Sequence, residues 1–169
     1  MWFTLIQSQV AWFAAVLLAA HSAPGAGALA ALALTAIQIG RSAQPRSDLR
    51  LVFAAAALGA LGDSVLAHAQ LLTFTAGTLV PGVTVPWMVA LWMNFATVLS
   101  QSLRALHTRP ILAGLLGAIG GPLAYAAGAR LGALTLTAPR GSLAAISLEW
   151  LIALPILCAL AQHRPARIP

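Results

Sequence analysis

Six apolar segments divide the sequence, and their length is the feature that most restricts its fold. They cover residues 2–20, 26–40, 51–72, 86–106, 110–130 and 141–161. A helix rises 1.5 Å per residue, so about 20 apolar residues cross the roughly 30 Å hydrocarbon core of a bilayer. The segments predict an all-α polytopic membrane protein, a six-transmembrane-helix bundle built as a single integral membrane domain over residues 1–169.

The amino-acid composition excludes an ordinary soluble domain. Of the 169 residues, 60% are hydrophobic and 7% are charged, whereas soluble domains carry about 25% charged residues. The formal net charge of +6 comes from nine arginines that lie between the apolar segments or in the tail. In a membrane protein such residues set orientation, so we expect membrane lipids as partners and no nucleic-acid binding.

The distribution of these arginines predicts the orientation of the bundle. In a six-helix arrangement seven arginines fall on one side, and only Arg130 and Arg140 fall on the other. Cytoplasmic loops carry the excess of basic residues, so both termini are expected in the cytoplasm of a bacterial inner membrane. The first segment lacks the basic residues and the cleavage site of a signal peptide, and we expect it to be retained.

Two stretches on the arginine-poor side alternate threonine with aliphatic residues around turn residues. They are "TFTAGTLVPGVTVP" and "LTLTAPRGS". Short hairpins over this face of the bundle and interfacial loops without regular structure both fit the pattern, and the sequence leaves the choice open.

The fifth segment carries a stripe of glycines at helical spacing. Gly114, Gly117, Gly121, Tyr125 and Gly128 follow intervals of three and four residues, so they share one face. In lipid, helices associate by close packing at small residues. The stripe predicts a helix contact, either inside the bundle or with a second copy or a membrane partner, and the Tyr125 hydroxyl needs a hydrogen-bond partner there.

The fourth segment has its own polar face, because Trp87, Asn94 and Gln101 recur every seven residues. An amide at the centre of a membrane helix is tolerated where another helix can form a hydrogen bond with it. Such a bond stabilises the helix contact by about 0.6–2 kcal/mol. We therefore expect Asn94 to point into the bundle.

The chain has three acidic residues, Asp48, Asp63 and Glu149. Asp48 falls in the arginine-rich loop and is expected to be solvated. Asp63 and Glu149 lie inside apolar segments, where an acid costs about 2.5–3.5 kcal/mol on insertion scales. Counted from the helix ends, both acids and Asn94 lie roughly 10–14 Å below the arginine-poor boundary. Ionisable groups at such depth favour a functional site over a purely structural cluster in which an acid pairs with Arg130.

These residues define a site hypothesis. Asp63, Asn94 and Glu149 are expected to converge in one cavity that opens on the arginine-poor side, with Asp63 and Glu149 as catalytic acid and base. The substrate-binding candidates are Asn94, Tyr125, Arg130, Trp87, Trp92, Trp150 and Gln70. No metal-ligand spacing, phosphate loop or dinucleotide motif is present, so we expect neither a metal nor a cofactor. Ser64 and His68 share a face, which favours a local hydrogen bond over a nucleophilic pair.

The stretches "PWMVALWMNFATVLSQSL", "GPLAYAAGARLGA" and "GDSVLAHAQLLTF" carry a family resemblance over residues 59–155. The chain resembles a family of short bacterial inner-membrane proteins classed as a domain of unknown function, which implies an integral membrane protein and no assigned activity. The "LGD" ending at Asp63 is also similar to one in the multi-pass lysoplasmalogenases, which hydrolyse vinyl-ether lipids with membrane-embedded carboxylates.

Three functions compete at this point. The acids and the aromatic residues favour a lipid-handling or lipid-modifying protein. The same acids would also serve a small-solute or proton-coupled permease as a relay, although the chain has no internal repeat typical of such carriers. The glycine stripe favours a structural or accessory subunit that docks a partner helix.

Overall fold

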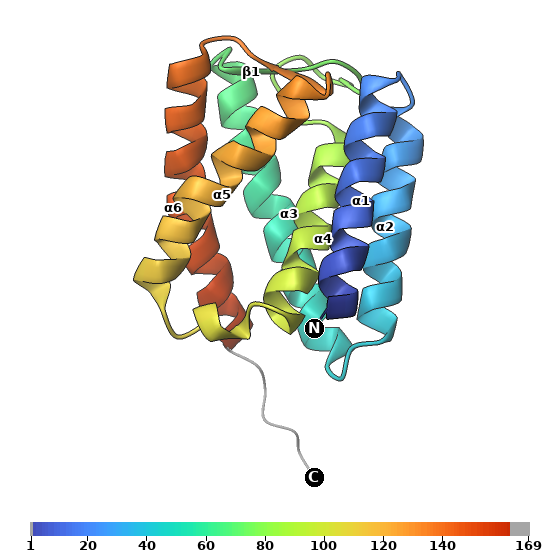
Figure 1. Ribbon diagram of the computed structural model, residues 1–169, viewed down its shortest axis with the longest axis vertical. Coiled ribbons are helices and arrows are strands. Elements are labelled where there is room, and N and C mark those ends of the chain that lie inside the picture. The colour runs from blue at the N-terminus through green and yellow to red at the C-terminus, as the bar shows by residue number, and fades with distance from the viewer. Residues whose placement is uncertain (1, 163–169) are drawn as a thin grey trace.

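The computed structural model describes residues 2–162 as a bundle of six α-helices (Figure 1). Successive helices run antiparallel, so α1 begins and α6 ends at the same end of the bundle, here called the terminal end. The opposite end is called the sheet end. The helices are α1 Trp2–Ala20, α2 Pro24–Gly40, α3 Pro45–His68, α4 Pro86–Gln101, α5 Pro110–Arg130 and α6 Pro139–Gln162.

Proline sets the start of every helix after the first. Proline has no N–H and a fixed φ, so it suits the first turn, where the N–H would have no partner within the helix. The turn between α1 and α2 closes in three residues because Ser22 adopts a φ of 61°. The helices that begin at proline start at Pro24, Pro45, Pro86, Pro110 and Pro139.

Within the described residues, four helices are long and apolar enough to cross a membrane, namely α1, α3, α5 and α6. The outer surface of the bundle is apolar as well, with Trp2 71% exposed, Leu61 68% and Ile111 81%. Such a surface is stable where lipid rather than water surrounds the helices. The structure is therefore that of an all-helical membrane protein.

Two of the predicted segments had wrong boundaries. The third segment was expected over 51–72, but α3 begins at Pro45 and ends at His68, so Leu72 is in a strand. Because α3 starts earlier, Asp48 lies in its first turn and is buried rather than solvated. An acid is favoured there by the helix dipole. The fourth segment was expected to reach residue 106, but α4 ends at Gln101 and a 3₁₀ turn, η1 Arg104–Leu106, follows.

The two threonine-containing loops pair with each other. Strand β1 Leu72–Phe74 is antiparallel to β2 Leu134–Leu136, with Leu72 opposite Leu136 and Phe74 opposite Leu134. Neither a hairpin within one loop nor two irregular loops describes this arrangement. The small sheet joins the α3–α4 connection to the α5–α6 connection (Figure 1). It therefore links α3 and α4 to α5 and α6 at the sheet end.

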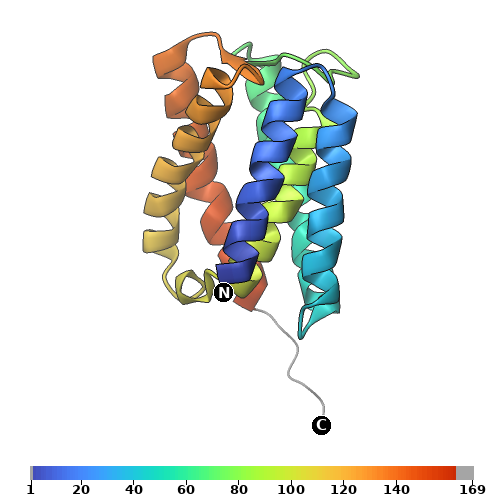
Figure 2. The ribbon, with the colours of Figure 1, turned by 45° about the vertical axis from the view of Figure 1, so that its right-hand side comes forward.

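The helices form two packing groups, one of α1, α2, α3 and α4 and one of α5 and α6. Helices α1, α2 and α4 pack on one another, and α3 packs on α4 and α6. Helix α5 packs mainly on α6, and it stands away from α1 and α4 (Figure 2). The glycine face of α5 is buried, which confirms the predicted helix contact. Two of its glycines, Gly117 and Gly121, face Trp150 of α6.

Replacing Gly117 by alanine is expected to destabilise the bundle. A Cβ there would overlap the backbone carbonyl oxygen of Trp150, which cannot rotate away, and overpacking of this kind costs about 1–3 kcal/mol. Thermal unfolding in detergent measures the effect. Gly120→Ala, three positions further along the same helix, is the control, because a Cβ at Gly120 meets nothing within 4 Å. Equal melting temperatures for the two variants would contradict the close α5–α6 contact.

Candidate functional site

The carboxyl group of Asp63 joins three helices. Asp63 lies on α3 and is 0% exposed. Its Oδ2 accepts a hydrogen bond of 2.9 Å from Trp92 Nε1 of α4, and its Oδ1 accepts one from the Tyr125 hydroxyl of α5. The acid therefore has partners for both of its oxygens, and each of the two donors has an acceptor, as buried polar groups require.

An aromatic layer covers this carboxyl group. Trp92 stacks on Trp150 of α6 with ring centroids 4.3 Å apart and an interplanar angle of 20°, and Phe95 meets Trp150 edge-on at 5.1 Å. Glycines make room for the rings, since a Cβ at Gly59 would overlap Trp92 and one at Gly121 would overlap Trp150. The stack links α4 to α6 next to the hydrogen bonds of Asp63.

Glu149 lies beside this cluster without a partner. Both carboxyl oxygens are buried and make no hydrogen bond within the described residues, and the same holds for Trp150 Nε1. The carboxyl packs against Gly62, where a Cβ would overlap it. Gly62 immediately precedes Asp63, so the Glu149 carboxyl contacts α3 next to the residue that carries the other acid. The structural alternative, in which an acid pairs with Arg130, does not hold for Asp63, whose oxygens face Tyr125 and Trp92.

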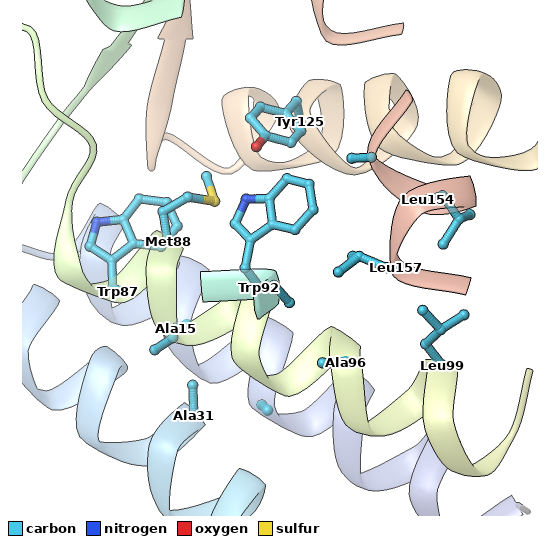
Figure 3. Packing of buried hydrophobic residues seen from close by; sticks show 14 of the residues in the cluster. Ala15, Ala31, Trp87, Met88, Trp92, Ala96, Leu99, Tyr125, Leu154 and Leu157 are labelled. Atoms are coloured by element: carbon cyan, nitrogen blue, oxygen red, sulfur yellow. The ribbon is translucent and has the colours of Figure 1, made fainter. Parts of the chain in front are cut away.

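A cavity of about 480 Å³ lies between α1 and α4 on one side and α5 and α6 on the other. On α5 its lining runs from Gly117 to Gly128, which is about 17 Å along the helix axis. Figure 3 shows Met88 and Trp92 of α4 directed toward Tyr125 of α5. No lining residue is charged. Its aromatic lining residues are Trp12, Trp87, Trp92, Phe95, Tyr125 and Trp150.

The structure brings together some predicted site residues and separates others. Lining positions are occupied by Trp87, Trp92, Trp150, Asn94 and Tyr125. Neither acid lines the cavity, so the expectation of a cavity lined by both acids is wrong. Asp63 lies behind Tyr125 and Trp92, and Glu149 lies against α3.

Two further predicted residues also lie away from the cavity lining. Arg130 is the last residue of α5 and is exposed. Gln70 follows the end of α3, is exposed, and has a φ of 58°. Because α3 ends at His68, Gln70 no longer continues the helical face that would have carried it toward Asp63.

Asn94 is directed at α1 and α2. Its Oδ1 accepts a 2.6 Å hydrogen bond from the Ser8 hydroxyl, and its Nδ2 donates to Thr35 Oγ1 at 3.2 Å. About two turns further along α4, Gln101 Oε1 accepts a hydrogen bond from the Thr4 hydroxyl at 3.1 Å. The predicted inward face of the fourth segment is therefore confirmed, and it serves as a polar seam between three helices.

The contribution of α1 was missed by sequence reasoning. Ser8, Gln9, Trp12 and Val16 line the cavity. The signal was present, since Ser8, Trp12 and Val16 are spaced by four residues on one face of the first segment. Within the described residues, no group of three His, Cys, Asp or Glu side chains is placed to hold a metal ion.

Fold and cavity together define an all-helical integral membrane protein with an aromatic-walled cavity inside the bundle. The chain belongs to the family described as protein of unknown function (DUF2878), whose model matches residues 1–156. This confirms the family resemblance of its sequence, while the three-residue likeness to lysoplasmalogenases stays a resemblance. No curated protein and no solved structure matches the chain.

The hydrogen bonds of Asp63 with Trp92 and Tyr125, here called the Asp63 bridge, are expected to couple the effects of substitutions at these residues on stability. Asp63→Ala leaves two buried donors without an acceptor and should lower the free energy of unfolding by roughly 2–4 kcal/mol. After Asp63→Ala, adding Tyr125→Phe should cost about 1 kcal/mol less than it does in the native chain. Equilibrium unfolding in a denaturing detergent measures the cycle. Thr73→Ala, exposed in β1, should be additive with Asp63→Ala, and additivity for Tyr125 as well would contradict the bridge.

Proposed function

We propose that this protein crosses the bacterial inner membrane six times and binds a lipid-soluble molecule in the cavity between α1, α4, α5 and α6. The observation that carries the proposal is the cavity itself. Its volume of about 480 Å³ lies in the range of roughly 300–1,000 Å³ that is usual for small-molecule sites. Apolar walls with a few polar groups are the usual makeup of such sites.

The shape of the cavity suits a chain-like ligand. Its lining follows α1 from Ser8 to Val16 and α5 from Gly117 to Gly128, so the cavity extends along the helices, the direction in which the acyl chains of a surrounding bilayer run. Helix α5 contacts α6 but stands away from α1 and α4. Helix packing therefore does not close the cavity between α5 and these two helices. At its rim Gly120 is exposed and faces open space. These features support lateral entry from the membrane.

The arginine distribution supports six spans with cytoplasmic termini. Among the described residues, Arg41, Arg46, Arg50, Arg104 and Arg109 belong to segments at the terminal end. Only two, at the end of α5 and the start of α6, lie at the sheet end. The predicted tail arginines Arg164 and Arg167 lie outside the described residues. By the positive-inside rule the terminal end faces the cytoplasm. Helices α2 and α4 have 17 and 16 residues, respectively, and they run beside longer neighbours.

We assign binding, rather than catalysis, to the cavity as it stands. Tyr125 and Trp92 separate Asp63 from the cavity, so the acid positions the wall. A lipid-modifying reaction with Asp63 and Glu149 as acid and base would need Tyr125 to move off Asp63 first. The glycine stripe gives little support to a docked partner helix, because Gly117 and Gly121 are already occupied by Trp150.

Reporter fusions test the membrane orientation. Fusions after His21 and after Ser42 follow α1 and α2, respectively, and they should report opposite sides of the membrane. Alkaline phosphatase should be active only after His21, and a fluorescent protein should be bright only after Ser42. Activity of the same reporter at both positions would contradict a membrane-spanning α2.

Filling the cavity at its rim should displace the ligand without unfolding the protein. Gly120→Leu adds a side chain that meets no protein atom at its Cβ and projects at a lining position. We expect lipid-soluble molecules that co-purify in mild detergent, quantified by mass spectrometry, to fall at least several-fold relative to protein. Gly25→Leu is the matched control, because Gly25 is equally open and lies away from the cavity. The same bound molecules at the same amounts in both variants would contradict the proposal.

A further inference from the structure

The direction of one hydrogen-bond chain determines what the cavity wall offers to a ligand. Thr35 Oγ1 donates to the carbonyl oxygen of Ala31 at 2.8 Å, so its oxygen is left to accept from Asn94 Nδ2. That bond fixes which end of the Asn94 amide faces α2. The Asn94 oxygen therefore faces α1, and Ser8 has to donate its proton to it at 2.6 Å.

Ser8 consequently presents an acceptor to the cavity. It lies on the lining, its only proton is used by Asn94, and a hydroxyl oxygen can accept as well as donate. Tyr125 is in the same position, since its hydroxyl donates to Asp63. The indole N–H groups of Trp87 and Trp92 donate to the Ala76 carbonyl at 3.1 Å and to Asp63. Two other polar groups belong to lining residues: the Trp150 N–H, which is buried without a bonded partner among the described residues, and the Gln9 amide, which can donate and accept. The hydroxyl oxygens of Ser8 and Tyr125 can therefore accept a hydrogen bond from a ligand group that donates one.

The lining also restricts the charge of the ligand. None of its residues is charged, and Arg130, a substrate-binding candidate from the sequence, is exposed at the end of α5 and lies outside the lining. An unpaired phosphate or carboxylate in such surroundings would lose its hydration without an opposite charge. An alcohol loses little, because it donates one hydrogen bond and accepts others.

We propose that the occupant of the cavity is an uncharged lipid bearing a hydroxyl group, whose O–H donates to Ser8. The inference rests on the proposed function and specifies its ligand class. Ser8 is the α1 lining residue nearest the terminal end, and it lies level with Asn94 near the centre of α4. The aromatic and glycine surfaces of the rest of the lining accommodate the hydrocarbon part of the molecule.

Tryptophan fluorescence offers a direct test with the purified full-length protein. Four of the five tryptophans line the cavity, namely Trp12, Trp87, Trp92 and Trp150. Bromine quenches indole fluorescence on contact. The probes are one dibrominated alkyl chain ending in an alcohol, in a methyl ether or in a carboxylate. We expect the alcohol to bind about fivefold more tightly than the ether, as one net hydrogen bond allows, and the carboxylate to bind most weakly.

The Ser8→Ala variant should bind the alcohol no better than the ether, with the affinity of the ether unchanged. Ser8→Thr keeps the hydroxyl and should restore the preference, which separates loss of the acceptor from loss of folding. Ser147→Ala, a helix serine away from the cavity lining, is the control. Equal affinities of alcohol and ether for the native protein, or tightest binding of the carboxylate, would overturn the ligand class while cavity binding stands. Failure of every probe to quench, with Gly120→Leu also without effect on co-purifying lipid, would overturn the proposed function itself.

Discussion

The carboxyl group of Asp63 is the interaction on which the rest of this structure depends. It is fully buried on α3 and accepts one hydrogen bond from α4 and one from α5. An acid inside a membrane bundle is costly unless its oxygens are satisfied. Here the satisfaction comes from the two side chains, Trp92 and Tyr125, that also form the wall of the cavity. The acid therefore shapes the cavity without touching its contents.

Glycine and tryptophan determine where the cavity lies. The glycine face of α5 receives Trp150 of α6, so α5 and α6 form a pair. Trp150 stacks in turn on Trp92 of α4, and this stack holds the pair beside α4 at the level of Asp63. The sheet of β1 and β2 ties the two halves at one end. Between these ties α5 stands away from α1 and α4, and the space that remains is the cavity.

Much of this architecture can be predicted from the sequence, because lipid imposes simple rules. Segment length gives the helices, and glycine spacing identifies the buried face of α5. The prolines at which α2, α3 and α6 start lie outside the predicted segments. The same rules give the depth and face of a residue but not the neighbour it meets. For that reason Asp63 was expected inside the cavity rather than behind it, and Ser8 was overlooked on a segment without acids. The pairing of β1 with β2 joins residues about 60 positions apart, which local patterns do not encode.

The most direct test of this account is a density map of the native protein in lipid nanodiscs. We predict elongated density along α5, between Gly117 and Gly128, that contacts Ser8 and lies against Tyr125, with Asp63 bonded to both Trp92 and Tyr125. A map in which α5 packs directly against α1 and α4, leaving no space between them, would contradict the account.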